Sequence, residues 1–190
     1  MIDKFIEDKV LNNIDYSNQD LSNKEFDNCT FNNCTFIASN LTKTDFVDCV
    51  FNNCEFNTCT IQDTGFKDVT FSACKLMGFH FSYCNTFLLA LKFEDCILDY
   101  SSFYKLPLKA TLFKKSSLKE VDFTEAILTQ ATFDECDLTA SVFDQSNLEK
   151  TDFRSAYNFI IDPENNRIKK AIFARNTLDG LLTKYDIIIS

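Results

Sequence analysis

Cysteine is the residue type with the most chemistry to offer in this 190-residue chain, which contains nine of them. Pairs at 29/34, 49/54 and 54/59 share a Cys-x4-Cys spacing, which could hold a metal ion or a disulfide. An odd number of cysteines, behind an N-terminus that does not resemble a secretory signal, favours reduced thiols instead. All nine also fall on one position of the five-residue repeat described below, so small-residue packing explains their spacing, and we expect no metal site.

The single histidine, His80, lies at a repeat position that predicts an outward side chain, and no nucleophile is beside it. The sequence also lacks a Gly-rich phosphate loop, a nucleophile elbow and a recognisable metal-binding motif. We therefore expect a protein that is not an enzyme and that binds no cofactor.

A five-residue period organises most of the chain. Every fifth residue from Tyr16 to Phe81 is apolar apart from the Tyr hydroxyl, and after a two-residue slip near 85–87 the pattern resumes from Leu88 to Phe153. The position two residues before each of these centres is usually Cys, Ser, Thr or Ala. Residues two apart on an extended chain point to the same side, so both positions face one interior and the chain turns a corner every five residues.

Four such corners close a square coil of about 20 residues, and successive coils stack at the strand spacing of about 4.8 Å. Residues 20 apart then lie in one column. The first half repeats this second period, because Leu21 to Phe36 and Leu41 to Phe56 both read Leu-Phe-Phe-Phe. Aromatic rings stack well at such a step, which favours Phe as the filler.

Units such as Cys29–Asn33 and Thr151–Ser155 resemble the A(D/N)LXX consensus of the pentapeptide-repeat family, over roughly residues 16–157. This resemblance implies an all-β fold, a right-handed quadrilateral β-helix, with a short C-terminal helix. We expect the solenoid over residues 1–157. The slip should bulge from one wall; a binding feature and a repaired insertion are both compatible with it.

Residues 158–190 should form a last irregular coil followed by a capping or dimerisation helix and a strand. Leu178, Leu181, Leu182 and Tyr185 are spaced as one apolar face of a short helix, and Ile187 to Ile189 suggest the strand. The resemblance implies that this tail forms a homodimer interface. The alternative is a cap that folds back on its own coil, since a solenoid end needs covering in either case.

The net charge of −9 disfavours nucleic acid as a direct ligand and leaves basic protein surfaces as partners. No stretch is apolar enough to span a membrane, and we expect a cytoplasmic protein. One wall should gather acidic side chains with Lys67 as their main offset: Glu25, Asp27, Asp45, Asp48 and Asp68. A solvated face that maintains solubility is the alternative interpretation.

The family resemblance implies a function. Its quinolone-resistance and gyrase-poison immunity members mimic duplex DNA and bind type II topoisomerases, DNA gyrase and topoisomerase IV, and a stiff acidic rod suits that role. We therefore expect a DNA mimic that contacts topoisomerase through the acidic wall. The alternative is a structural or scaffolding solenoid whose walls bind some other protein.

Overall fold

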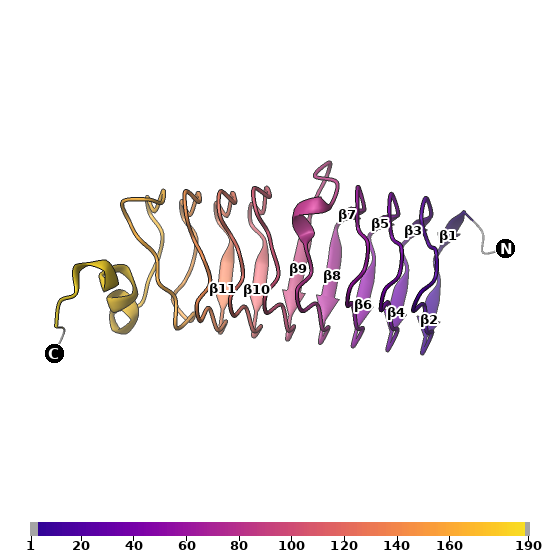
Figure 1. Cartoon of the computed structure of the whole chain (residues 1–190), viewed down its shortest axis with the longest axis horizontal. Coiled ribbons are helices and arrows are strands. Elements are labelled where there is room, and N and C mark those ends of the chain that lie inside the picture. Colours follow the sequence, from indigo (N-terminus) through magenta and orange to yellow (C-terminus); the bar gives the residue numbers. More distant parts are fainter. Residues whose placement is uncertain (1–3, 189–190) are drawn as a thin grey trace.

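The chain forms a straight rod of stacked coils, shown here by a computed structural model that describes residues 4–188 (Figure 1). Each strand pairs in parallel with the strand one coil later, which confirms the expected all-β solenoid. Wall A begins with a four-stranded sheet: β1 (Phe5–Glu7), β3 (Glu25–Asp27), β5 (Asp45–Val47) and β7 (Gly65–Lys67). Wall B is a seven-stranded sheet: β2 (Val10–Asn12), β4 (Thr30–Asn32), β6 (Val50–Asn52), β8 (Val69–Ser72), β9 (Leu91–Glu94), β10 (Leu112–Lys114) and β11 (Thr132–Asp134).

The other two walls are held by single β-bridges between neighbouring coils. Wall C runs through Thr35, Glu55 and Lys75 and on to Tyr157. Wall D includes Asn40 and Thr60 and, later, the pairs from His80 to Val142. Partners are 20 residues apart in both halves of the rod, as the sequence period predicts.

The interior is filled by stacked phenylalanines. Phe31 and Phe51 have ring centroids 4.6 Å apart and ring planes 12° apart, and Phe51 also meets Phe46 edge-to-face at 5.2 Å. Phe46 and Phe123, two of the expected core residues, are fully buried. Stacking within a column and edge contacts between walls are the two favoured arrangements of aromatic rings, so one residue type can fill the coil.

The corners explain why the first half is rich in asparagine. Nearly every corner residue has a positive φ, as at Asn28 (48°), Asn33 (53°) and Asn53 (51°). Asn tolerates this left-handed conformation better than other residues with a side chain. Side-chain amides at neighbouring positions also bond along the rod; Asn52 Nδ2 donates to Asn32 Oδ1 at 2.9 Å.

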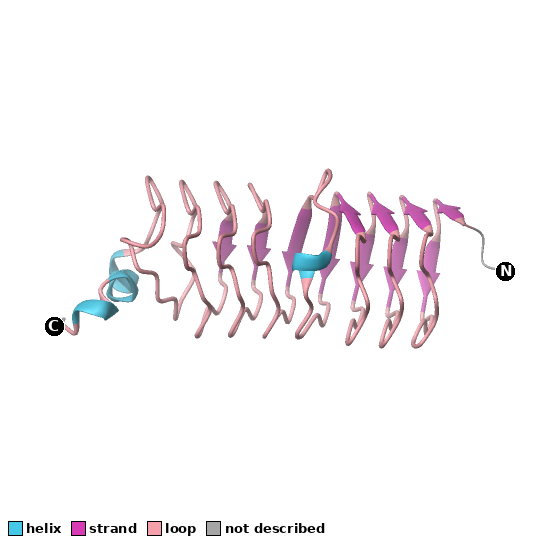
Figure 2. Cartoon of the chain, turned by 45° about the horizontal axis from the view of Figure 1, so that its top comes forward, coloured by secondary structure: helices cyan, strands magenta, loops and turns pink. Residues whose placement is uncertain are grey.

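The two-residue slip forms a protruding loop at mid-rod, next to the 3-10 helix η1 (Phe81–Tyr83) (Figures 1 and 2). Wall B continues past the slip, because Phe71 pairs with Phe93 across 22 residues instead of 20. Leu88 was expected to point inward, and this was wrong: Phe87 and Leu88 are 67% and 65% exposed. Leu89 packs half-buried against the core beside it, and Leu91 is buried at the start of wall B, where it pairs with Val69.

The first coil lies within the expected solenoid of residues 1–157, whereas the C-terminal end differs from the sequence expectation. The coil pattern starts before Tyr16, with Ile6 and Leu11 half-buried on β1 and β2. The C-terminal helix consists of two 3-10 segments, η2 (Arg175–Leu181) and η3 (Thr183–Tyr185). The expected terminal strand was wrong for residues 187–188, which have no regular structure, and Ile189 lies outside the described residues. No helix within residues 4–188 is long and apolar enough to cross a membrane.

Candidate partner-binding surface

The cysteines are part of the core. All nine are free thiols, and eight are buried while Cys59 is half-buried. Cys34, Cys54 and Cys74 form one column under wall C, as expected: the N–H of Cys34 donates to Cys54 Sγ at 3.4 Å, and the N–H of Cys54 donates to Cys74 Sγ at 3.3 Å. The sulfurs therefore serve as hydrogen-bond acceptors between coils.

Burial keeps three of the thiols outside this column, or at its far end, protonated. It raises the pKa of Cys49, Cys84 and Cys136 to about 12 in each case, because a thiolate in the apolar interior would lose its hydration. A thiol with such a pKa is a poor nucleophile and a poor metal ligand at neutral pH. Within residues 4–188, no three His, Cys, Asp or Glu side chains are arranged to hold a metal ion.

His80 is exposed on wall D, where the sequence predicts it. Its ring centroid is 5.8 Å from that of Tyr83, with the planes at 47°. This arrangement provides an aromatic contact surface. The side-chain N and O atoms that are buried in the described part of the chain all have hydrogen-bond partners.

The five carboxylates of the predicted acidic wall lie on wall A and its corner with wall B. Glu25 and Asp27 belong to β3, and Asp45 belongs to β5 directly beside Glu25. Asp48 and Asp68 occupy the same corner of successive coils, both with positive φ and both exposed. The fold therefore brings the five together on neighbouring coils.

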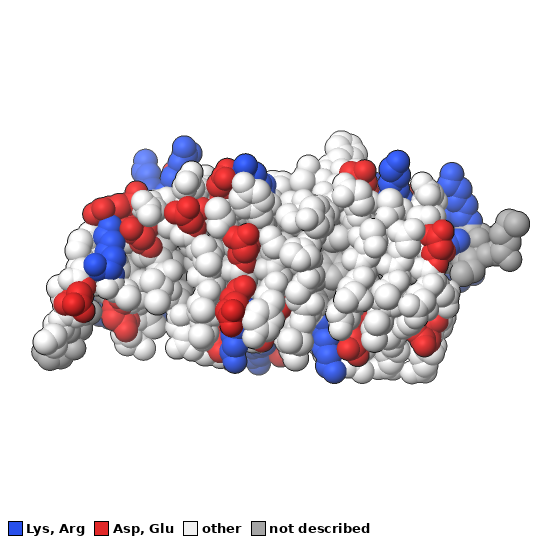
Figure 3. Space-filling view, viewed as in Figure 1, with Lys and Arg blue, Asp and Glu red and all other residues white. Residues whose placement is uncertain are grey.

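More lysines lie beside these carboxylates than the sequence suggested. Lys67 Nζ lies 2.9 Å from Asp45 Oδ1, the offset already expected from the sequence. At the corner with wall D, a shallow hollow of about 360 Å³ brings Lys4, Lys24 and Lys43 against Glu25 and Asp45. The most strongly acidic strip is therefore the corner between walls A and B. Figure 3 shows one face of the rod, where acidic and basic side chains alternate around a large uncharged area.

Wall B of the second half carries ion pairs between coils. Lys114 Nζ lies 2.6 Å from Glu94 Oε1, and this lysine holds the pKa of Glu94 below its usual range. Further along the rod, the guanidinium of Arg154 pairs with Asp152 of its own coil at 2.6 Å. Such exposed pairs neutralise the wall locally and contribute little to stability.

The predicted dimer residues lie on the cap that closes the C-terminal coil. Leu181 packs against the core and Leu182 is half-buried, whereas Leu178 and Tyr185 are 41% and 51% exposed. The N–H of Ile161 donates to the carbonyl of Gly180 at 3.0 Å, which holds the cap on the coil. The apolar face is thus divided between the protein's own core and its surface.

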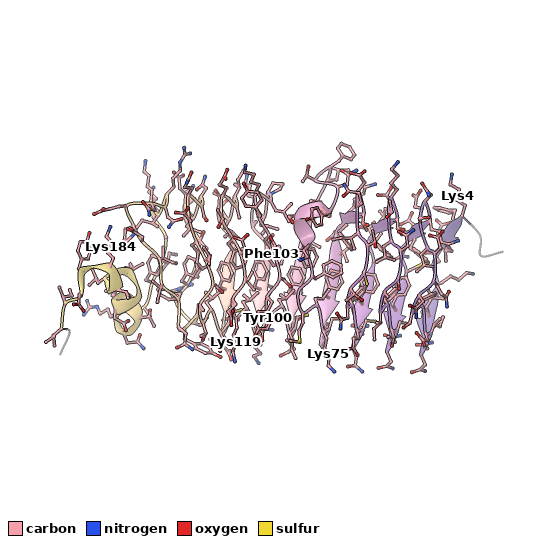
Figure 4. The ribbon with its side chains drawn as sticks, in the orientation of Figure 1. Lys4, Lys75, Tyr100, Phe103, Lys119 and Lys184 are labelled. Atoms are coloured by element: carbon pink, nitrogen blue, oxygen red, sulfur yellow. The ribbon has the colours of Figure 1, made fainter. Side chains whose placement is uncertain are left out.

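A group of exposed apolar side chains around the slip was not predicted from the sequence. Between the residues at positions 11 and 76 no large apolar side chain is exposed, and the next two coils expose several in succession. We call them the mid-rod aromatic patch: Met77, Tyr83, Phe87, Leu88, Tyr100 and Tyr104. Figure 4 shows Tyr100 near the edge of the coil that encloses Phe103. The sequence feature that could have predicted this patch is the presence of tyrosines at repeat corners, where Asn or Asp is usual.

Comparisons with known proteins agree with this fold. The structure of HetL, a pentapeptide repeat protein involved in heterocyst differentiation regulation from the cyanobacterium Nostoc sp. strain PCC 7120, superposes with a TM-score of 0.59 at 12% identity, over 89% of this chain and 86% of HetL. QnrB1, a plasmid-mediated fluoroquinolone resistance protein, gives 0.48 at 17% identity, over 98% of this chain and all of the compared QnrB1 chain. No curated protein sequence matches.

Two family models match the sequence. The model of the pentapeptide repeat region covers residues 45–123, and that of eight-copy pentapeptide repeats covers residues 116–154. Together they span more than half of the chain, on the coils that stack Phe and Leu in the interior. The chain belongs to the pentapeptide-repeat family.

Proposed function

We propose that this protein is a non-enzymatic binding protein that mimics duplex DNA and binds a type II topoisomerase, DNA gyrase or topoisomerase IV, in the cytoplasm. The observation that carries the proposal is the acidic corner between walls A and B, where Asp48 and Asp68 are exposed on successive coils and Asp8 occupies the same corner two coils earlier. Carboxylates at a step of about 4.8 Å resemble the closely spaced charges of a nucleic-acid strand.

The stiffness of the rod supports this proposal. Stacked rings fill the interior and every wall is bridged to the next coil, so the carboxylates are held in place before a partner arrives. Binding then loses little conformational entropy at the interface. The lysines beside Glu25 and Asp45 lower the charge density below that of DNA, so we expect weaker binding than DNA itself shows.

Supercoiling by purified gyrase tests the proposal. Wild-type protein should inhibit supercoiling, and the inhibition should weaken as salt rises, because both competitors bind the same Lys and Arg side chains. The triple variant D45N/D48N/D68N keeps side-chain shape and should inhibit much less. Quinolone susceptibility of a host that expresses each form is the cellular readout.

A matched control is D95N/E120Q/E135Q, which changes the net charge by the same three units at other corners of the rod. It should inhibit like wild type. If both triple variants inhibit equally, or if wild type has no effect at low salt, the acidic corner is a solvated surface and topoisomerase is not the partner.

A second candidate function rests on the mid-rod aromatic patch. Interface cores are poor in charge and rich in Tyr, Phe and Met, which is the composition of this patch. A scaffolding solenoid would hold its partner here and not at the acidic corner. In that case a partner isolated with wild type should be lost with Y83S/F87S and retained with D45N/D48N/D68N.

A further inference from the structure

The corner between walls A and B changes the sign of its charge halfway along the rod. Its nine positions are all exposed, and the register across the slip places Ala90 in the middle. In order along the rod they are Asp8, Asn28, Asp48, Asp68, Ala90, Ala110, Gln130, Lys150 and Lys170. The three aspartates precede Ala90 and the two lysines follow it. Within residues 4–188, none of these five charged side chains forms an ion pair.

We propose that this corner binds the same corner of a second copy, with the two rods antiparallel and a two-fold axis at Ala90. Positions at equal distances from the axis meet in such a contact, because the step between coils is constant at about 4.8 Å. Asp8 then faces Lys170 of the second copy, and Asp48 faces Gln130. Each of these contacts occurs twice.

The columns on either side of the corner decide which wall takes part. On wall A, the antiparallel arrangement would place Lys67 against Lys109, and Asp27 against Glu149, so like charges would meet. The outward column of wall B has one such contact, where Lys92 lies on the axis and would face Lys92 of the second copy, whereas each conflict on wall A occurs twice. On wall B, Val10, 65% exposed, faces Ile172, 44% exposed, and the positions between them are mostly Val, Thr and Leu.

A second copy fits this edge better than a nucleic acid. Phosphates would be attracted to Lys150 and Lys170 and repelled by Asp48 and Asp68, whereas a second copy pairs Asp8 with Lys170 and places uncharged side chains opposite the other charges. The contact is only two columns wide, so we expect a weak dimer that depends on low salt. Asp48 and Asp68 also belong to the proposed topoisomerase surface, so the dimer would cover part of that surface. The self-association itself does not depend on topoisomerase binding.

Sedimentation velocity tests the self-association. At about 20 mM salt, where charges interact over more than 10 Å, the mean mass should rise from 21.9 kDa towards twice that value with concentration. At about 300 mM salt these charges are screened, so the mean mass should fall back to the value of protein whose corners are not paired. A mass that does not change between the two salt concentrations would overturn the proposal.

A charge exchange separates this contact from general electrostatic effects. We expect the salt-dependent association to be lost in each of two variants, D8K/N28K and K150D/K170D. In both, position 8 of one copy meets a like charge at position 170 of the other. A 1:1 mixture of the two variants should recover the association, because every contact in the mixed dimer that involves position 8, 28, 150 or 170 again joins a lysine to an aspartate or asparagine. A mixture that associates no better than the separate variants would contradict the antiparallel arrangement.

Cross-linking tests the direction of the two rods. Asp48→Cys and Gln130→Cys introduce exposed thiols at positions that face each other across the axis. Mild oxidation of the mixture should give a disulfide-linked heterodimer at low salt. Asp48→Cys alone should give several-fold less, since its own copies lie four coils apart; efficient self-linking would indicate parallel rods and sink the proposal.

Discussion

The backbone N–H of Cys54 lies 3.3 Å from the Sγ of Cys74, one coil later in the same column. Cys54 in turn accepts the N–H of Cys34 at 3.4 Å. Cys54→Ala should therefore cost more than the lost volume alone, about 1 to 2 kcal/mol in the free energy of unfolding, because a buried N–H loses its acceptor. Urea denaturation under reducing conditions measures this.

Cys54→Ser is the matched control. Ser116 occupies the same column and its Oγ accepts the N–H of Cys96 at 3.1 Å, so a hydroxyl fits this position. We expect Cys54→Ser to be the more stable of the two variants. The opposite order would show that the sulfur acts by volume and not as an acceptor.

Phe51→Ala should lower the free energy of unfolding by about 3 to 5 kcal/mol. Its ring stacks on Phe31 at 4.6 Å and on Phe71 at 5.0 Å, so the cavity would interrupt the column in both directions. Phe87→Ala, at the exposed loop, removes the same atoms and should change stability by less than about 0.5 kcal/mol. Equal losses in the two variants would mean that the stacked interior does not dominate stability.

Stability should fall at alkaline pH. The folded pKa of the Cys49 thiol is raised to about 12, while an unfolded thiol titrates near about 8.5. The folded state therefore binds more protons than the unfolded state above pH ~8.5, and each such thiol contributes stability that declines by up to ~1.4 kcal/mol per pH unit between these values. Urea midpoints from pH 7 to 10 report the slope. Cys49→Ala should make the slope shallower, and an unchanged slope would assign it to other groups.

We also propose the homodimer at the C-terminal cap that the family resemblance implies, and it predicts that Leu178→Lys gives a monomer in light scattering at high salt, where the corner contact is screened. Leu178 is a better choice than Leu181, which packs against the protein's own core. Ile127→Lys, at an exposed position of wall A, should leave the mass unchanged. If wild type is already monomeric under these conditions, the tail only caps its own coil.

Cap closure itself can be tested at Gly180. A Cβ at this residue would overlap the carbonyl oxygen and ring of Phe159. Gly180→Ala should therefore detach the 3-10 segments and speed amide hydrogen exchange at Ile161, whose N–H bonds to Gly180. Unchanged protection at Ile161 would show that the cap can shift without opening.

The period of the sequence predicted most of the fold because each coil repeats one packing problem. An inward residue every fifth position, with a small residue two places before it, requires a corner in every unit, and Phe31, Phe51 and Phe71 occupy the predicted column. The period could not predict Leu88. Two extra residues can be absorbed anywhere in a coil, and here Leu88 turns outward while Leu89 packs against the core and Leu91 pairs with Val69.

The acidic surface was less predictable for a related reason. The repeat specifies which side chains point outward and which columns they join, so the grouping of Asp45, Asp48 and Asp68 followed from the sequence. It does not specify how far a long lysine reaches. In the structure Lys24 and Lys43 line one hollow together with Asp45.

The 22-residue pairing of Phe71 with Phe93 means that a coil can be lengthened without disturbing its neighbours. The seven strands of wall B keep their register while residues 86–89 leave and rejoin the coil beside them. Foreign peptides grafted between Thr86 and Leu89 should therefore be displayed on a rigid support. Over time, the same site would let this lineage acquire new binding specificities while the coils on either side stay unchanged.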